Sequence, residues 1–166
     1  PNNIVDEAGA LKEHQTDAIW IYYGWGGISA ELQGLDFNYF YFKDLDPVFD
    51  YYTPVIIANN DFLAEHPDTA KAFLSATAKG YEYAIAHPEE AAQMLIESDT
   101  TGSLKDSAEL VTASQKWMAD QYQAEAERWG YIDPSRWNAF YRWLSDNNLV
   151  EQPIPENTGF SNDYLA

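Results

Sequence analysis

The sequence predicts an α/β fold in which short strands come first and helices follow. Three short apolar runs, 18–23, 37–42 and 55–58, lie in the first part of the 166-residue chain and are bounded by turn residues. From residue 61 onward, apolar side chains recur instead at the three- and four-residue spacings of helices. Hydrophobic residues make up 46% of the chain and aromatic residues 16%, which is enough apolar surface for a folded core.

The first elements are a short helix over 6–14 and a strand over 18–23. The strand segment reads AIWIYY and has no polar alternation, which is typical of a strand covered on both faces in a parallel sheet. Gly24 ends this strand.

A second helix and a second strand follow the glycine. Ile28, Leu32 and Leu35 have helical spacing up to Gly34, a plausible stop, and 37–42 is the second strand. Aromatic residues inside the two strands are expected to pack in the core: Trp20, Phe37, Phe40 and Phe42.

The third strand follows a loop. Prolines and acids predict a loop over 43–53, and the apolar run 55–58 is a short strand that ends at the polar residues 59–61.

The rest of the chain is predicted to be helical. An apolar stripe predicts a helix over 67–87, and Pro67, Pro88 and Pro134 each stand at a first helical position. Asp133 is expected to cap the helix that begins at Pro134, and Ser103 with Asp106 a helix that reaches Trp117. The tail, 151–166, is expected to be a loop.

Charge and composition exclude several classes of function. The 27 acidic residues outnumber the 9 basic ones, and the net charge of −18 repels nucleic-acid phosphates and anionic lipid surfaces. The chain has no cysteine and only three histidines, of which His66 and His87 precede prolines at helix starts. We therefore expect no catalysis, no metal site and no cofactor.

The strongest candidate site is the glycine-rich turn 24–27, which joins a predicted strand to a predicted helix. Open α/β sheets bind ligands at such turns, and Trp25 favours a flat ligand over a phosphate. Tyr22, Tyr23 and Trp25 are candidate stacking residues, with ordinary packing as the alternative. Asp46, in the following loop, is a candidate hydrogen-bond acceptor for an amino group, with simple solvation as the alternative.

Five segments together carry a family resemblance: TDAIWIYYGW (16–25), PVIIANN (54–60), PDTAKAFL (67–74), ERWGYID (127–133) and WNAFY (137–141). The chain resembles the thiamine-biosynthesis-type solute-binding proteins of ABC importers. The resemblance runs along nearly the whole chain.

This resemblance implies a type II periplasmic-binding-protein fold that is incomplete here. Such proteins are about twice as long and have two α/β lobes. Residues 1–60 would form part of the second lobe with the returning hinge strand, and 61–166 a C-terminal helical region that packs on both lobes. The surface left by the missing lobe would be exposed or covered by pairing with another chain.

The resemblance also implies a function. Such proteins deliver a pyrimidine precursor of thiamine, of the hydroxymethylpyrimidine or formylaminopyrimidine type, to an ABC permease. They act outside the cytoplasm, and the full-length protein is expected to be lipid-anchored. Tyr22, Tyr23 and Trp25 carry over as pyrimidine contacts, whereas Gly26 stands where relatives often have an acid.

Two other readings remain open. One is a pyrimidine-synthesising enzyme of the same fold, which a catalytic histidine or cofactor-binding lysine in the cleft would support. The other is a binder of another small organic solute. An aromatic sugar-binding surface is disfavoured, because four of the tryptophans have core-like helical spacing: Trp117, Trp129, Trp137 and Trp143.

Overall fold

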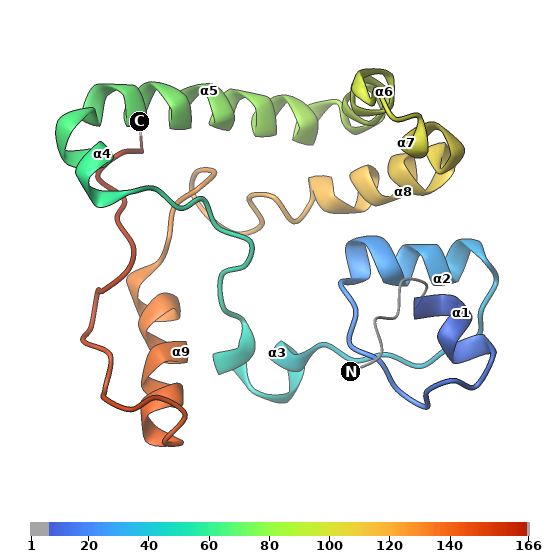
Figure 1. Cartoon of the computed structure of the whole chain (residues 1–166), viewed down its shortest axis with the longest axis horizontal. Coiled ribbons are helices and arrows are strands. Elements are labelled where there is room, and N and C mark those ends of the chain that lie inside the picture. The colour runs from blue at the N-terminus through green and yellow to red at the C-terminus, as the bar shows by residue number, and fades with distance from the viewer. Residues whose placement is uncertain (1–6, 166) are drawn as a thin grey trace. The chain divides into compact units, whose positions relative to one another are not determined.

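A computed structural model describes residues 7–165, which form two units (Figure 1). Within the described residues, the first unit comprises 7–38 and 80–125, and the second comprises 39–79 and 126–165. The elements are α1 (Glu7–Lys12), the π-helix η1 (Tyr23–Gly27), α2 (Ile28–Leu32), α3 (Phe42–Leu45), the 3₁₀ helix η2 (Pro47–Phe49), α4 (Asn60–Glu65), α5 (Pro67–Ala86), α6 (Pro88–Ser98), α7 (Ser103–Asp106), α8 (Ala108–Ala119) and α9 (Pro134–Asp146).

Small side chains form the core of the first unit. Its buried hydrophobic residues among those described come from four helices: Ala8, Ala10, Ile28, Ala30, Ala92, Val111 and Ala119. Helix α6 packs on α8, and α2 and η1 also contact α8. Alanines at these contacts let the helix axes approach closely. Lys116 of α8 also pairs with Glu89 of α6 at 2.6 Å, which links the exposed sides of the two helices.

Aromatic rings form the packing of the second unit. Phe140 of α9 stacks on Tyr51 with ring centroids 4.4 Å apart, and Trp143 meets Phe49 edge-on at 5.1 Å. Rings in these geometries attract one another beyond the area that they bury. The loop after α3 is therefore held against α9.

Polar contacts complete this unit. The Arg136 guanidinium donates to Asp50, pairs with its carboxylate at 2.8 Å and lies over the ring of Tyr52. The buried side chain of Asn138 exchanges two hydrogen bonds with Asn157, and in this way α9 holds the tail. The tail itself has no helix or strand over 151–165, as the sequence predicts.

Several helix predictions are confirmed. Helices α5, α6 and α9 begin at Pro67, Pro88 and Pro134, and the Asp133 carboxylate accepts the backbone N–H of Arg136 at 2.8 Å. Along the predicted stripe of α5, most residues are buried or half-buried, but the Phe73 side chain is exposed.

The helix after the glycine-rich turn begins at Ile28 and ends at Leu32, two residues before the expected stop at Gly34. Gly34 has a φ of +67°, and the N–H of Leu35 bonds the carbonyl of Ala30 at 3.0 Å. A residue in this left-handed conformation turns the chain out of the helix, and glycine adopts it without a steric cost. The first predicted helix is α1, although its expected first residue, Asp6, lies outside the described residues.

The strand predictions are not confirmed. Over 7–165 the structure contains no strand: residues 18–22, 37–41 and 55–59 are irregular, and the loop 43–53 contains two short helices instead. The backbone at Tyr22 and Tyr41 is nevertheless extended, with ψ values of 116° and 137°. A strand requires a partner for its N–H and C=O groups. No described segment supplies one, so the α/β class remains unconfirmed.

The expected core positions of these runs are wrong for three of the four aromatic residues. Trp20 and Phe40 are each 66% exposed, Phe42 is also exposed, and Phe37 is half-buried. The expectation assumed a sheet covered on both faces. Without strand pairing there is no such sheet to cover these rings.

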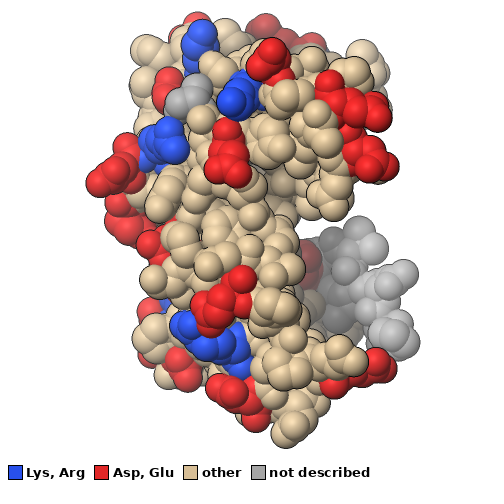
Figure 2. All heavy atoms as spheres, turned by 90° about the vertical axis from the view of Figure 1, so that its left-hand side faces the viewer, with Lys and Arg blue, Asp and Glu red and all other residues tan. Residues whose placement is uncertain are grey.

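Charged groups are spread over the surface. On the face drawn in Figure 2, Asp and Glu side chains outnumber Lys and Arg, and basic groups lie beside acidic ones. Within 7–165, no helix is both long and apolar enough to cross a bilayer.

The helix over 103–119 differs from expectation, because Asp99 takes the capping role predicted for Ser103. The chain forms α7, breaks at Ser107 and continues as α8. The Asp99 carboxylate accepts the N–H of Leu104 at 2.8 Å and both the N–H and the hydroxyl of Thr101. The Leu104 N–H, with the Thr101 groups, holds the pKa of Asp99 at about 2, below its ordinary value of 3.8.

This carboxylate predicts a pH-dependent contribution to stability. Because the pKa is lower in the folded state, the contribution is complete above the unfolded value and disappears as the pH falls from about 4 to about 2. We expect Asp99→Asn to destabilise the protein above about pH 5, with a difference from wild type that shrinks over that acid range. Urea unfolding at several pH values measures it. Asp120→Asn is the control, because Asp120 accepts no side-chain hydrogen bond among the described residues; an equal effect there would contradict the prediction.

Candidate functional site

The predicted glycine-rich turn is the π-helix η1 in the first unit. Tyr22 directly precedes η1 with an extended backbone, and Trp25 lies three residues later, within η1. Their side chains are 69% and 45% exposed. Among residues 7–165 neither ring has a hydrogen-bond or aromatic partner. Two large flat surfaces therefore face solvent at the position where the sequence predicts ligand contacts.

Tyr23 has different surroundings. Its half-buried ring lies against Trp117 of α8, with centroids 5.2 Å apart and planes tilted by 45°. Its hydroxyl donates a hydrogen bond to the carboxylate of Glu31 on α2. Both ends of the side chain are thus held by protein, and a role for Tyr23 in ligand contact stays a prediction.

Two glycines of η1 allow close packing around this ring. A Cβ at Gly27 would lie 2.6 Å from the Tyr23 ring, and one at Gly24 would lie 2.6 Å from the Met118 sulfur and 3.0 Å from the ring of Trp117. At 2.6 Å an added Cβ would be closer to its neighbour than real Cβ atoms come. The two glycines therefore let the turn pack tightly against the side chains of Tyr23, Trp117 and Met118, whereas Tyr22 and Trp25 are exposed.

Helix α8 holds the turn in place. The Ser114 hydroxyl donates a hydrogen bond to the carbonyl of Gly24, 90 positions earlier in the sequence. Ser114, Trp117 and Met118 have i, i+3 and i+4 spacing, which puts them on one face of α8. All three contact the same short segment of chain.

Asp46 belongs to the other unit of the chain. There its carboxylate accepts the N–H of Val48 at 3.0 Å and caps η2. The sequence Asp46-Pro47 matches Asp133-Pro134, so the local sequence indicates a capping role for Asp46, which the site prediction did not include. A ligand role for Asp46 stays a prediction.

Three residues that shape the turn had no signal in the sequence: Glu31, Ser114 and Trp117. The spacing of Trp117 predicts only helical packing, and nothing in the local pattern connects α8 with residues 23–27. Such a contact follows only from the tertiary fold.

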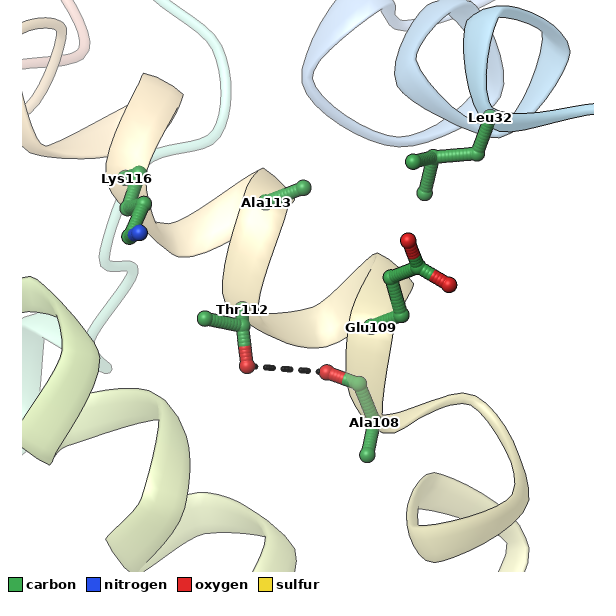
Figure 3. Close-up of a pocket in the computed structure, with 6 residues that line it drawn as sticks. All are labelled: Leu32, Ala108, Glu109, Thr112, Ala113 and Lys116. Atoms are coloured by element: carbon green, nitrogen blue, oxygen red, sulfur yellow. Dashed lines mark hydrogen bonds between the residues drawn. The ribbon is translucent and has the colours of Figure 1, made fainter. Parts of the chain in front are cut away.

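A shallow groove of about 440 Å³ lies between α2 and α8 (Figure 3). Leu32 points across it toward α8, and Glu109 projects from α8 on the facing side. Its other lining residues are Ala108, Thr112, Ala113 and Lys116. None of the four predicted site residues lines this groove. Within the described part of the chain, no cluster of three or more His, Cys, Asp or Glu side chains forms a metal-binding arrangement.

Comparison with known proteins identifies relatives. The family model described as "NMT1/THI5 like" matches residues 2–91. A formylaminopyrimidine-binding protein of Halalkalibacterium halodurans is 27% identical over 134 residues, which cover 78% of this chain and 39% of the relative. A 4-amino-5-hydroxymethyl-2-methylpyrimidine phosphate synthase of Candida albicans is 28% identical over 118 residues, which cover 69% of this chain and 31% of the synthase.

The matches have two consequences. The chain spans less than half the length of each of these curated relatives. The matched family has a periplasmic-binding-type fold, and its region of match includes the complete turn from Tyr22 to Gly27. Since the family model covers more than half of the sequence, the predicted family relationship is confirmed: this chain belongs to the NMT1/THI5-like family.

Proposed function

We propose that the chain is part of an extracytoplasmic substrate-binding protein that delivers a thiamine pyrimidine precursor to an ABC importer. The observation that carries the proposal is the pair of exposed rings, Tyr22 and Trp25, on a glycine-rich turn within the matched family region. The pyrimidine-binding relative supports the ligand class. Single-turn π-helices are also frequent at functional sites.

In this proposal a flat pyrimidine stacks on the ring of Trp25, and Tyr22 adds contact area and a hydroxyl. Aromatic rings at a site of this kind bury a planar ligand and orient its polar edge. Tyr23 forms the inner support of the turn. Gly26 leaves this segment without the acid that relatives often carry, so another group accepts the hydrogen bond of the ligand's amino group.

The proposed architecture divides the chain at residue 60. Residues 1–60 belong to the second lobe and include the returning hinge strand, and 61–166 form the helical region that packs on both lobes. The irregular segment 55–58 supports this, because its apolar side chains are exposed and Ile57 reaches 87%. An apolar segment of this kind is normally covered by a neighbour. Ligand binding would then select a closed arrangement of the lobes.

Calorimetric titration of the full-length protein tests the function. We expect saturable binding of hydroxymethylpyrimidine and formylaminopyrimidine, weaker binding of thiamine, and none of glucose or maltose. A flat amino-bearing ring matches the exposed aromatic residues, whereas a sugar ring is neither planar nor aromatic. Binding of the sugars alone would reject the proposed class.

The second candidate is pyrimidine synthesis, which the Candida albicans relative favours. Mass spectrometry distinguishes the two functions. As a binding protein, the full-length protein should return an aminopyrimidine unchanged and should generate none from precursor mixtures. Formation of a pyrimidine phosphate would favour the enzyme.

A further inference from the structure

We infer that Ser114 and Trp117 of α8 are positioning residues for the ligand site, and that they set the orientation of Tyr22 and Trp25 without touching the ligand. The inference rests on the proposed function. It assigns to a helix outside the matched family region the task of fixing the aromatic turn.

The contacts act on the backbone and on the inner ring of the turn. Ser114 donates its hydroxyl hydrogen to the Gly24 carbonyl, the residue directly before Trp25. Trp117 lies against Tyr23, the residue directly after Tyr22. Each exposed ring is therefore next in sequence to a residue that α8 holds.

Helix α8 is suited to this task because it is itself anchored. Val111 and Ala119 are buried on it, and its partner α6 contributes the fully buried Ala92. Ser114 and Trp117 lie between the two buried positions. A shift of the turn relative to α8 would break the hydrogen bond between Ser114 and Gly24 and, at the same time, move the Tyr23 ring away from Trp117.

The exposed rings depend on this support. Neither Tyr22 nor Trp25 has a side-chain hydrogen bond or ring contact within the described part of the chain, so the backbone of the turn decides where they point. A ligand that stacks on a pre-oriented ring loses less freedom on binding than one that must order the turn first. Loosening the turn should lower affinity even though the stacking surface is intact.

The test replaces Ser114 in the full-length protein. Ser114→Ala is expected to weaken hydroxymethylpyrimidine binding by roughly three- to tenfold, the equivalent of one lost hydrogen bond. Ser114→Thr retains the hydroxyl and should bind within about twofold of wild type. The control is Ser145→Ala, since Ser145 is also half-buried and donates to a carbonyl, that of Tyr141, but lies on α9 in the second unit.

A second readout separates positioning from general stability. The protein is labelled with 5-fluorotryptophan, and the fluorine resonance of Trp25 is identified by its loss in Trp25→Phe. Without ligand, Ser114→Ala should shift or broaden this resonance, whereas Ser145→Ala and Ser114→Thr should leave it unchanged.

The outcomes distinguish this inference from the proposed function. An unchanged Trp25 resonance and unchanged affinity in Ser114→Ala would overturn the positioning role, as would an equal response to Ser145→Ala. If the wild-type protein binds no pyrimidine but its Trp25 resonance responds to Ser114→Ala alone, the positioning role stands and the proposed ligand is wrong.

Discussion

Replacing Trp25 with alanine is expected to weaken hydroxymethylpyrimidine binding by roughly 10- to 100-fold in the full-length protein. Stacking of a heteroaromatic base on an aromatic side chain contributes about 1–3 kcal/mol, and about 1.4 kcal/mol changes a dissociation constant tenfold. The Trp25 side chain is exposed and has no hydrogen-bond or ring partner among residues 7–165, so its truncation removes the proposed ligand surface and breaks no such contact. Titration calorimetry measures the loss.

Two further variants at the same position test the physical cause. Trp25→Phe keeps a flat ring and should retain much of the affinity, whereas Trp25→Leu is apolar but cannot stack and should resemble Trp25→Ala. Equal affinities of the Phe and Leu variants would show that apolar burial, not stacking, holds the ligand. Wild-type affinity in Trp25→Ala would end the assignment of this turn as the site.

The helices were the most predictable part of the fold because their signals are local. Pro67, Pro88 and Pro134 each mark a helix start, because proline fixes a helical φ and lacks only an N–H that the first turn leaves unpaired. The cap at Asp133 is predicted by its position directly before Pro134. Neither the break at Ser107 between α7 and α8 nor the hydrogen bond from the start of α7 to Asp99 was predicted.

The strands could not be predicted correctly from local sequence patterns alone. The aromatic and β-branched residues of 18–23 do favour extended backbone, and the structure has extended backbone at Tyr22. A strand is defined by its pairing, however, and the pairing partner is not contained in the pattern of the segment itself. The missing strand pairing also explains why Trp20 and Phe40 are exposed, because their predicted burial depended on the sheet.

The candidate site was predictable only in part, because some of its contacts come from a segment far away in the sequence. Turn chemistry and ring type indicated Tyr22 and Trp25, and both are exposed on one turn. The separation between the outer ring of Trp25 and the inner ring of Tyr23 depends on α8, far away in the sequence, and no local signal predicts it. The tight packing of that inner ring makes Gly27 a sensitive position.

Gly27→Ala is expected to destabilise the protein by about 1–3 kcal/mol, as overpacking does. Gly27 has ordinary helical angles, with φ −65° and ψ −48°, so alanine meets no backbone strain there. The added Cβ would instead lie 2.6 Å from the Tyr23 ring. That ring has Trp117 on one side and a hydrogen bond to Glu31 at its end, so moving it breaks both contacts. Urea unfolding of the full-length protein measures the effect.

Gly80 provides the matched control, because a Cβ there meets nothing within 4 Å in the interior of α5. Gly80→Ala should stabilise the protein by about 0.5–1 kcal/mol, since alanine restricts the unfolded chain and favours the helix. The cause of the Gly27 effect is tested by repeating Gly27→Ala in a Tyr23→Ala background, where the clash is absent. There the substitution should cost nothing. A loss of stability that is the same in both backgrounds would mean that the Tyr23 ring is not what requires glycine at position 27.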